Sequence, residues 1–286
     1  MASNGELIGV TGATGRLGGR VARRLAAARV PQRLLVRDVA RAPELPGAVP
    51  EHAWFADTDE VRRALMGVST LLMVSAAETP DRLQQHRAFV DAAAAAGVEH
   101  VIYTSFAGAA ADCTFTLGRD HYATEQHIRA SGMEFTFLRD NFYADFMTAM
   151  VGADGVVRGP AGNGRVAAVA VDDVADAAAA VLRDPASHRG ATYTLTGPEA
   201  LTLDEAAEIM SSALDRPVHY QRETLEEAYA SRASYGAPPW QLDAWVSTYT
   251  SIAAGEVAAV TDDVPRLAGH TATSLAALLR EGRSAY

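Results

Sequence analysis

Residues 6–25 read ELIGVTGATGRLGGRVARRL, and this stretch decides the fold. An apolar run is followed by Gly12, Gly15 and Gly18 and then by an amphipathic segment, which places the glycines in a turn between a strand and a helix. In such a turn the first glycine permits a tight bend, the second lets a pyrophosphate approach the backbone, and the third lets the helix pack on the sheet. The N–H groups and dipole of the helix N-terminus complete an anion site. A purely structural turn is the alternative, but a strand–turn–helix context that opens a βα series favours dinucleotide binding.

The following residues repeat this strand–helix alternation. Short apolar runs bounded by turn residues predict strands at Leu7–Val10, Arg33–Val36, Ala53–Phe55, Thr70–Val74, His100–Thr104 and Glu134–Arg139. Amphipathic segments between them predict helices at Arg16–Ala28, Thr58–Met66, Arg82–Ala96 (closed by Gly97) and Arg119–Ala130. The alternation predicts an α/β fold, a Rossmann-type doubly wound parallel sheet with helices on both faces.

The rhythm changes beyond Tyr143. A glycine-rich stretch at 152–164 predicts a turn-rich crossover, and VAAVAVDDVADAAAAVL predicts a strand and then a helix with Asp172 or Asp173 as its N-cap. Further expected elements are a strand at Thr192–Thr196, a helix begun by Thr202, a strand at Pro217–Tyr220, and helices with loops from Thr224 onward. We therefore predict an NADP-binding domain at residues 1–155 and a smaller substrate-binding lobe at 156–286, some segments of which return to the first domain.

The composition is that of a soluble globular protein. The chain has 286 residues, of which 49% are hydrophobic, and 25 Lys+Arg against 35 Asp+Glu give a formal net charge of -10. That charge opposes binding to phosphates, and the arginines form no stripe, so direct nucleic-acid binding is not expected. The sequence contains no lysine. A GK[ST] phosphate loop, a Schiff-base enzyme and a Tyr-x-x-x-Lys dehydrogenase dyad all need a lysine amine and are therefore excluded.

The cysteine and hydropathy patterns indicate a cytoplasmic protein. The one cysteine, Cys113, cannot form an internal disulfide, and no Cys/His cluster has zinc spacing, so neither a disulfide scaffold nor a metal site is expected. Met1–Gly5 lead into the first strand without a signal-like segment, and no run approaches the ~20 apolar residues of a membrane span. We expect no membrane association.

The end of the second predicted strand, RLLVRD, bears on the choice between NADP and NAD. A ribose-selective NAD enzyme usually presents a carboxylate to the 2′-hydroxyl at this point, whereas this chain first presents Arg37. The planar guanidinium suits a 2′-phosphate, so NADPH is favoured over NADH, with Arg16 as a second candidate contact. The alternatives are NAD bound by Asp38, and a solvent-exposed Arg37–Asp38 pair without a role in binding.

Five stretches carry a family resemblance: TGATGRLG, LLVRD, HYATEQHIRASGMEFTFLRDNFYADF, VAVDDVADAAAAVL and YTLTGPEALTLDEAAEI. Over nearly its whole length the chain resembles the atypical short-chain dehydrogenase/reductases of the NmrA-like group. Within that group it is similar to the bacterial NAD(P)H:quinone oxidoreductases and triphenylmethane reductases. The resemblance implies NADP as the cofactor, a small aromatic or quinone-like substrate, and a homodimer as one option for its assembly.

The resemblance also assigns roles to individual positions. It implies that the pyrophosphate is held by the loop Gly12, Ala13, Thr14, Gly15, Arg16, Leu17 and Gly18. It places Arg37 at the 2′-phosphate and Asp57 beside the adenine. It implies that the ribose and nicotinamide are lined by Ala76, Ser105 and Phe106.

The catalytic dyad of related reductases is missing. Its lysine falls at His121 of this chain and its tyrosine at Leu117. Reduction of a ketone gives an alkoxide that needs a proton donor, whereas hydride addition to a quinone leaves a delocalised anion and a triarylmethyl cation becomes neutral. His121 is a candidate proton donor, and Tyr122 is a weaker one. Alternatively, His121 is a structural residue bonded to Glu125, one helical turn later.

An aromatic and apolar set follows the sixth predicted strand, where doubly wound sheets bind ligands: Phe142, Tyr143, Phe146 and Met147. Core packing explains each of them equally well, but together with Phe106 they could form an apolar slot for a flat ring. Trp240 and Trp245 could close this slot from the second lobe.

Two functions from different classes follow. The first is an NADPH-dependent oxidoreductase that passes hydride to a flat, electron-poor acceptor such as a quinone or a cationic dye. The second is a regulator of the NmrA type, which senses the dinucleotide and acts through a protein partner without turnover. Sugar-nucleotide epimerisation is disfavoured because the tyrosine and lysine of the dyad are missing.

Overall fold

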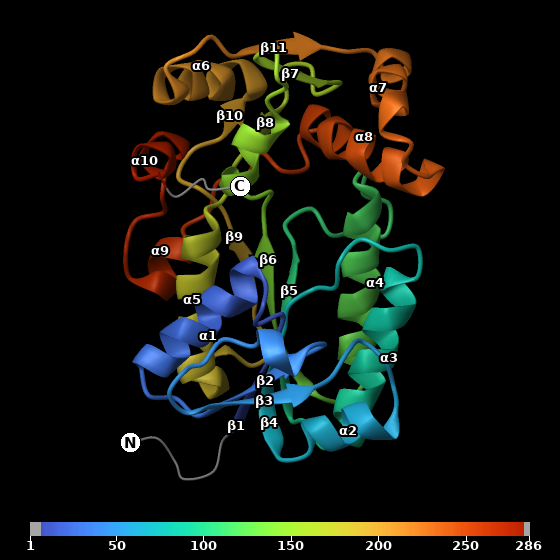
Figure 1. Ribbon diagram of the computed structural model, residues 1–286, viewed down its shortest axis with the longest axis vertical. Helices are drawn as coiled ribbons and strands as arrows, with labels where there is room; N and C mark the ends of the chain where they lie inside the picture. Colours follow the sequence, from blue (N-terminus) through green and yellow to red (C-terminus); the bar gives the residue numbers. More distant parts are fainter. Residues whose placement is uncertain (1–6, 283–286) are drawn as a thin grey trace. The chain divides into compact units, whose positions relative to one another are not determined.

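A seven-stranded sheet is the main element of the computed structural model, which describes residues 7–282 (Figure 1). The strand order is β3-β2-β1-β4-β5-β6-β9, and the pairings of β1 with β2 and β4, of β2 with β3 and of β4 with β5 are parallel. The strands are β1 (Leu7–Thr11), β2 (Gln32–Val36), β3 (Ala48–His52), β4 (Val68–Met73), β5 (His100–Phe106), β6 (Glu134–Asp140) and β9 (Thr192–Leu195). The direction of strand addition reverses between β1 and β4, and doubly wound sheets bind ligands at the carboxyl ends of such strands. The predicted α/β class and Rossmann-type sheet are confirmed.

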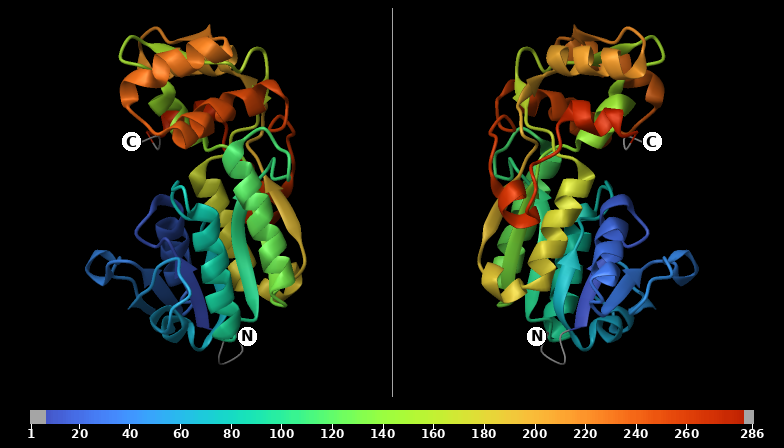
Figure 2. Two further views of the ribbon diagram at one scale, coloured as in Figure 1. Left: turned by 90° about the vertical axis from the view of Figure 1, so that its right-hand side faces the viewer. Right: turned by 90° about the vertical axis from the view of Figure 1, so that its left-hand side faces the viewer.

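Helices cover both faces of this sheet (Figures 1 and 2). One face carries α1 and α5, and the other carries α3 and α4, with α2 packed beside α3. Arg24 of α1 joins Asp176 of α5 through two hydrogen bonds of 2.6 and 3.1 Å. The helices are α1 (Arg16–Ala27), α2 (Asp59–Leu65), α3 (Arg82–Ala95), α4 (Thr116–Ala130) and α5 (Val171–Arg183).

The core beneath α3 follows the two-residue period of the strands. Leu71 and Met73 of β4, and Val101 and Tyr103 of β5, point to the same side and are fully buried against Phe89 of α3. This cluster positions Tyr103, whose hydroxyl is the one polar group among these five side chains.

The chain divides into two compact units that interleave along the sequence. The first unit consists of Met1–Ser105, Asp120–Arg139 and Val174–Tyr193, and the second of Phe106–Arg119, Asp140–Asp173 and Thr194–Tyr286. The chain therefore passes between the units several times. The cofactor and substrate roles predicted for residues 1–155 and 156–286 stay predictions.

The second unit contains two small sheets and several helices. In it, β7 pairs with β11 in parallel and β8 pairs with β10 in antiparallel orientation, while α6 packs against α10 and β11. Thr202 caps α6 in a capping box with Glu205, as expected from its position before the helix. The elements are the 3₁₀ helix η2 (Ala144–Met150), β7 (Val156–Gly159), β8 (Arg165–Val166), β10 (Leu201–Thr202), α6 (Leu203–Leu214), β11 (His219–Arg222), α7 (Leu225–Arg232), α8 (Pro239–Ala253), α9 (Asp263–Ala268) and α10 (Leu275–Arg280).

Three predictions about strands are wrong. The third strand lies at Ala48–His52 rather than at Ala53–Phe55, because it is an edge strand with mostly exposed side chains and the apolar signal belongs to the loop after it. The glycine-rich stretch 152–164 contains a strand, β7, which forms by pairing with β11. Its partner begins at His219, two residues later than predicted.

The N-terminus of α5 also differs from the prediction. The helix begins at Val171, whose N–H donates to the carboxylate of Asp145 at 2.8 Å, so neither Asp172 nor Asp173 is the N-cap. Asp173 instead accepts hydrogen bonds from the N–H and the hydroxyl of Thr273, at 2.6 and 2.8 Å. A distant carboxylate therefore replaces the local cap. Among residues 7–282, no helix is long and apolar enough to cross a membrane.

Candidate functional site

The glycine-rich turn joins the carboxyl end of β1 to the N-terminus of α1, at the reversal point of the sheet. Gly12 has a φ of +64°, in the left-handed region that favours glycine, and its carbonyl accepts the Gly15 N–H at 2.8 Å. Among the described residues no side chain caps α1, and its first turn contains no acidic residue. The N–H groups and the dipole of this turn are therefore suited to an anion such as a phosphate.

Gly15 and Gly18 serve different purposes in this turn. A Cβ on Gly18 would lie 2.4 Å from the Gly12 carbonyl oxygen and 2.6 Å from that of Thr11, so only glycine lets the helix approach the strand. A Cβ on Gly15 would meet only the Gly12 oxygen, at 3.2 Å, and Gly15 is exposed. The fold requires Gly18, whereas the space beside Gly15 faces outward.

The other predicted loop residues divide by burial. Thr14 and Arg16 are exposed, while Ala13 and Leu17 are buried and support the turn from beneath. Their contacts with a cofactor stay predictions.

Arg37 follows β2 directly and is exposed. It makes no hydrogen bond or ion pair with another residue of the range 7–282, so its guanidinium is available to a ligand. Asp38, the rival residue, accepts the Ala40 N–H at 3.0 Å and caps the short 3₁₀ turn that begins at Val39. This geometry favours a phosphate partner at the end of β2 over a ribose hydroxyl bound by a carboxylate.

Asp57, the residue expected beside the adenine, follows β3 and is bound by Arg62. The Arg62 guanidinium donates to both of its carboxylate oxygens, at 2.6 and 2.8 Å. These hydrogen bonds hold the pKa of the Asp57 carboxyl below its ordinary value. Asp57 is therefore an ionised acceptor with a fixed orientation.

His121, the candidate proton donor, is buried in α4 and both of its ring nitrogens are bonded. Arg82 lies 3.0 Å from Nε2 and the Tyr103 hydroxyl lies 2.9 Å from Nδ1. A guanidinium only donates, so Nε2 accepts and the proton of the neutral ring resides on Nδ1. Burial, reinforced by the charge of Arg82, holds the pKa of His121 well below its ordinary value of 6.5. This environment disfavours His121 as an acid, and its role stays a prediction.

Glu125 is the centre of a separate buried group rather than the partner of His121. Ser105 donates to Glu125 Oε1 at 2.6 Å, and Arg139 donates to both carboxylate oxygens, at 2.8 and 2.6 Å. Glu125 and Ser105 are 0% exposed. Because the Ser105 hydroxyl donates its proton to Glu125, it can only accept from a ligand. Tyr122, the weaker catalytic candidate, is half-buried and close enough to Arg139 to influence its pKa.

Part of the predicted aromatic set comes together in the second unit. Phe106 is 4% exposed, and its ring centroid lies 5.0 Å from that of Phe142 and 4.9 Å from that of Phe115. Phe115 lies 5.2 Å from Phe142 and completes the cluster. The sequence analysis missed Phe115, which a search for further rings near the fifth strand could have found. Mutual packing accounts for these three rings, and Met147 is likewise buried.

Tyr143 and Phe146 are the more accessible members of the set. Their rings are stacked with centroids 5.9 Å apart, and Phe146 is 42% exposed. The Tyr143 hydroxyl donates to the carboxylate of Asp140, which holds the ring in place. Trp240 lies half-buried in the first turn of α8, and Trp245 makes an edge-on contact with Tyr235. That Trp240 and Trp245 close the apolar slot for a flat ring stays a prediction.

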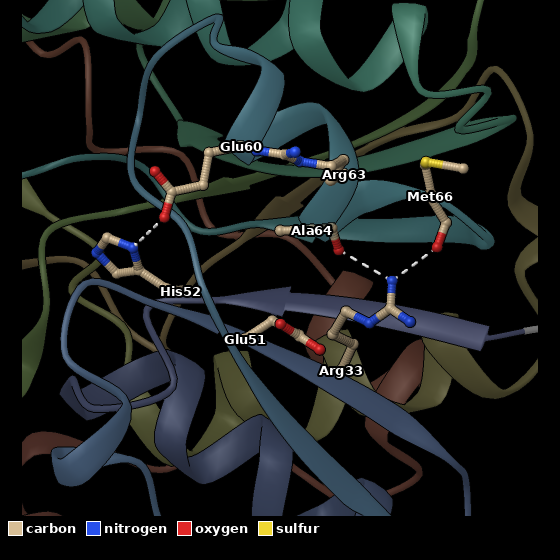
Figure 3. Close-up of a pocket in the computed structure, with 7 residues that line it drawn as sticks. All are labelled: Arg33, Glu51, His52, Glu60, Arg63, Ala64 and Met66. Carbon is tan, nitrogen blue, oxygen red and sulfur yellow. Dashed lines mark hydrogen bonds and ion pairs between the residues drawn. The ribbon is translucent and has the colours of Figure 1, made fainter.

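A pocket of about 280 Å³ in the first unit has no residue of the glycine-rich turn in its lining (Figure 3). Charged side chains dominate its lining, which consists of Arg33, Glu51, His52, Glu60, Arg63, Ala64 and Met66. Figure 3 shows Arg33 turned toward the carbonyls of Ala64 and Met66, to which it donates at 2.9 and 2.7 Å, and His52 turned toward Glu60. Arg33 thus caps the C-terminal end of α2. None of the predicted site residues lines this pocket.

The sequence analysis missed two residues beside the predicted site, Arg82 and His86. Arg82 is 3% exposed and donates to the Ala76 carbonyl at 3.0 Å, while His86 is fully buried and accepts the Ala76 N–H at 2.9 Å. Both lie in α3, and no local motif distinguishes them. Within residues 7–282 no group of His, Cys, Asp and Glu side chains is placed to hold a metal ion.

Comparison with known proteins identifies the family of this chain and finds solved structures with the same fold. Residues 4–237 match the NmrA-like family. The NAD(P)H azoreductase of Xenophilus azovorans is 33% identical over 98% of this chain and 99% of its own length. The crystal structure of the NADPH-dependent quinone oxidoreductase of Escherichia coli in complex with NADPH is 32% identical with a TM-score of 0.89, covering 96% of this chain and 99% of that one. The Citrobacter sp. triphenylmethane reductase in complex with NADP(H) is also 32% identical, with a TM-score of 0.85 and the same coverage. The family match spans most of the chain and these relatives span nearly all of it, so this protein belongs to the NmrA-like family.

Proposed function

We propose that this protein is an NADPH-dependent oxidoreductase that transfers hydride to a flat, electron-poor acceptor such as a quinone or a cationic aromatic dye. The observation that carries the proposal is the uncapped N-terminus of α1 at the reversal point of the sheet, together with the available guanidinium of Arg37 at the end of the neighbouring strand. The names of its relatives, an azoreductase, a quinone oxidoreductase and a triphenylmethane reductase, support both the cofactor and the class of acceptor.

The residues present fit the dinucleotide. The first turn of α1 would hold the pyrophosphate, Arg37 the 2′-phosphate and Asp57 the adenine side. Ala76 and the acceptor oxygen of Ser105 would lie toward the nicotinamide end. The bound cofactor supplies the hydride, and the protein contributes its orientation.

Replacing Arg37 tests the cofactor assignment. Arg37→Ala should weaken NADPH binding by roughly 10- to 150-fold, because a charge-assisted contact to phosphate is worth about 1.5–3 kcal/mol. NADH binding should hardly change, since NADH lacks the 2′-phosphate. Isothermal calorimetry with both cofactors measures the difference, and Arg41→Ala, four residues later in the exposed 3₁₀ turn that follows Arg37, is the matched control. Equal affinities of the unmodified protein for NADPH and NADH would refute the role of Arg37.

The stacked Tyr143–Phe146 pair supports an aromatic acceptor. The two stacked rings present a flat face on which the ring of an aromatic acceptor can stack. Phe146 is 42% exposed and therefore accessible to such an acceptor. Hydride addition to a quinone produces a delocalised anion, which needs less help from an acid than an alkoxide does. His121 is neutral, and each of its ring nitrogens is engaged in a hydrogen bond. This state fits a reaction that has no dedicated acid.

Turnover of His121→Ala is expected to fall less than about tenfold with a quinone, because general acid catalysis contributes roughly 10²- to 10⁴-fold where it operates. Stopped-flow oxidation of NADPH between about pH 5.5 and 8.5 measures the effect. The unmodified protein should show no inflection near pH ~6.5, since burial and the charge of Arg82 hold the pKa of His121 below that range. A loss above about a hundredfold, together with disappearance of such an inflection, would instead identify His121 as the proton donor.

A dinucleotide-sensing regulator of the NmrA type is the alternative function. Both functions require cofactor binding, so only turnover separates them. We expect oxidation of NADPH in the presence of quinones or cationic dyes at rates that scale with protein concentration. Tight NADPH binding without oxidation by any member of an acceptor panel would favour the regulator.

A further inference from the structure

The backbone that follows β4 is held by side chains from three other elements. Three successive N–H groups donate to side chains: Val74 to Thr11 Oγ1 at 2.8 Å, Ser75 to Thr104 Oγ1 at 2.9 Å, and Ala76 to His86 Nε2 at 2.9 Å. The segment also borders the glycine-rich turn, because a Cβ on Gly12 would lie 3.4 Å from the Val74 side chain. All three N–H groups are therefore occupied at the reversal point of the sheet.

Arg82 holds the same segment from the carbonyl side. Its Nε donates to the Ala76 carbonyl at 3.0 Å, and its Nη2 donates to His121 Nε2 at 3.0 Å. The Arg82 side chain is 4% exposed, and its ion pair with Asp120 is long, at 3.5 Å. A buried guanidinium without a close carboxylate costs stability. Structures that keep such a charge commonly do so for function.

The hydrogen bonds fix the protonation of both histidines. The Ala76 N–H and the Arg82 guanidinium only donate, so Nε2 accepts in both His86 and His121. The His86 Nδ1–H then donates to Thr124 Oγ1 at 2.9 Å, and the Thr124 hydroxyl donates to the Asp120 carbonyl at 2.7 Å. Protonating His86 would place an N–H against the Ala76 N–H and break this bond. Both rings must remain neutral for the segment to keep its conformation.

We propose that Arg82 and His86 are positioning residues for the nicotinamide end of the cofactor, which they serve by fixing both backbone polar groups of Ala76. This inference rests on the proposed function and deepens it. Since the N–H groups of Val74, Ser75 and Ala76 are all occupied, the segment guides the ring by its shape rather than by donating hydrogen bonds. The phosphates determine affinity elsewhere on the dinucleotide, so loss of Arg82 affects hydride transfer more than binding.

The charges around the two rings favour their neutral forms. His86 faces Arg82, the Tyr103 hydroxyl and the ring of Phe55, and burial followed by the charge of Arg82 lowers its pKa to about 3. His121 faces Arg82, Tyr103, His86 and Arg139, and the charges of Arg82 and Arg139 reinforce the effect of burial in lowering its pKa. The nearby carboxyls of Asp120 and Glu78 have pKa values raised by burial, an effect that Arg82 partly offsets.

The test compares Arg82→Gln with Arg87→Gln, the same substitution at an exposed position five residues later in α3. Arg82→Gln should bind NADPH within about threefold of the unmodified affinity. Its single-turnover hydride transfer to the quinone menadione should be about 10- to 100-fold slower, since misplacing a reactant by about 1 Å has effects of this size. Arg87→Gln should match the unmodified protein. Arg82→Lys retains the charge, but a lysine ammonium lacks the forked guanidinium that reaches both the Ala76 carbonyl and His121 Nε2. Its rate of hydride transfer should therefore fall between those of Arg82→Gln and Arg87→Gln.

A readout independent of turnover separates this proposal from the proposed function. The fluorescence anisotropy of bound NADPH reports the mobility of the nicotinamide, and it should be lower in Arg82→Gln than in Arg87→Gln. Equal anisotropy and equal transfer rates in the two variants would overturn the positioning role even if the enzyme proves active. Reduced anisotropy in a protein that oxidises no NADPH would support the positioning role and reject only the oxidoreductase assignment.

The unmodified protein supplies a further test that holds even if Arg82→Gln does not fold. ¹⁵N NMR of the histidine rings should show His86 and His121 neutral, with the proton on Nδ1, from about pH 5.5 to 8. Titration of either ring in this range, or a proton on Nε2 of either ring, would contradict the proposal.

Discussion

Gly15→Val is expected to remove NADPH binding while leaving the protein folded. A Cβ at this position would meet only the Gly12 oxygen, at 3.2 Å, and Gly15 has the extended φ of -94° and ψ of -178°, which valine adopts readily. The rest of the side chain would occupy the space in front of the α1 N-terminus, where the pyrophosphate is expected. Calorimetry should detect no binding up to about 1 mM NADPH, and circular dichroism should show an unchanged fold.

Gly18→Ala is the control for this prediction. Its single added Cβ would lie 2.4 Å from a backbone oxygen, so it should destabilise the turn and lower the midpoint of thermal unfolding. The smaller side chain should therefore do more damage to the fold than the larger one three residues earlier. Retained micromolar NADPH binding by folded Gly15→Val would mean that the cofactor lies elsewhere.

Glu125→Ala should be the most destabilising substitution among the described ion pairs of the first unit. Removing one partner of a buried pair costs about 3–5 kcal/mol, and the low end applies here because Arg139 is 24% exposed and reaches some water. The substitution would also leave the Ser105 hydroxyl without its acceptor. Urea unfolding followed by circular dichroism measures the change in the free energy of unfolding.

Two further variants separate charge from packing at this site. Glu125→Gln keeps the shape and an acceptor for Ser105, so its loss of stability should be smaller than that of Glu125→Ala. The double variant Glu125→Leu/Arg139→Met removes both charges and should recover much of the stability, since apolar replacement of a buried pair is often neutral or stabilising. If Glu125→Ala lowers the free energy of unfolding by less than about 1 kcal/mol, the Glu125–Arg139 pair contributes no more than an ordinary surface ion pair does.

The elements that could be predicted from the sequence are those with a strong local signal. The glycine turn, the buried strands and the capped helix α6 have apolar periodicity or a capping residue within a few positions. The edge strand β3 has neither, and β7 forms only because β11 lies beside it. The cap of α5 comes from Asp145, 26 residues earlier, which no local pattern reveals.

The same contrast holds at the site. The exposed position of Arg37 could be predicted because it depends only on where the second strand ends. The partners of His121 could not, because Arg82 and Tyr103 come from α3 and β5, and the helical spacing suggested Glu125 instead. Long-range hydrogen bonds decide the protonation of this histidine, and they follow from tertiary packing alone.

The interleaving of the two units limits how recombination can reshape this protein. A single crossover near residue 155 would join α1 from one parent to α5 from another, so Arg24 and Asp176 would come from different parents. The same crossover would divide the sheet, because β9 comes after it in the sequence while β6 comes before it. Only an exchange of three separate segments transfers a whole unit. Point substitutions, for instance at the predicted substrate residues Tyr143 and Phe146, leave the sheet and the Arg24–Asp176 pair intact, whereas swapping halves between relatives does not.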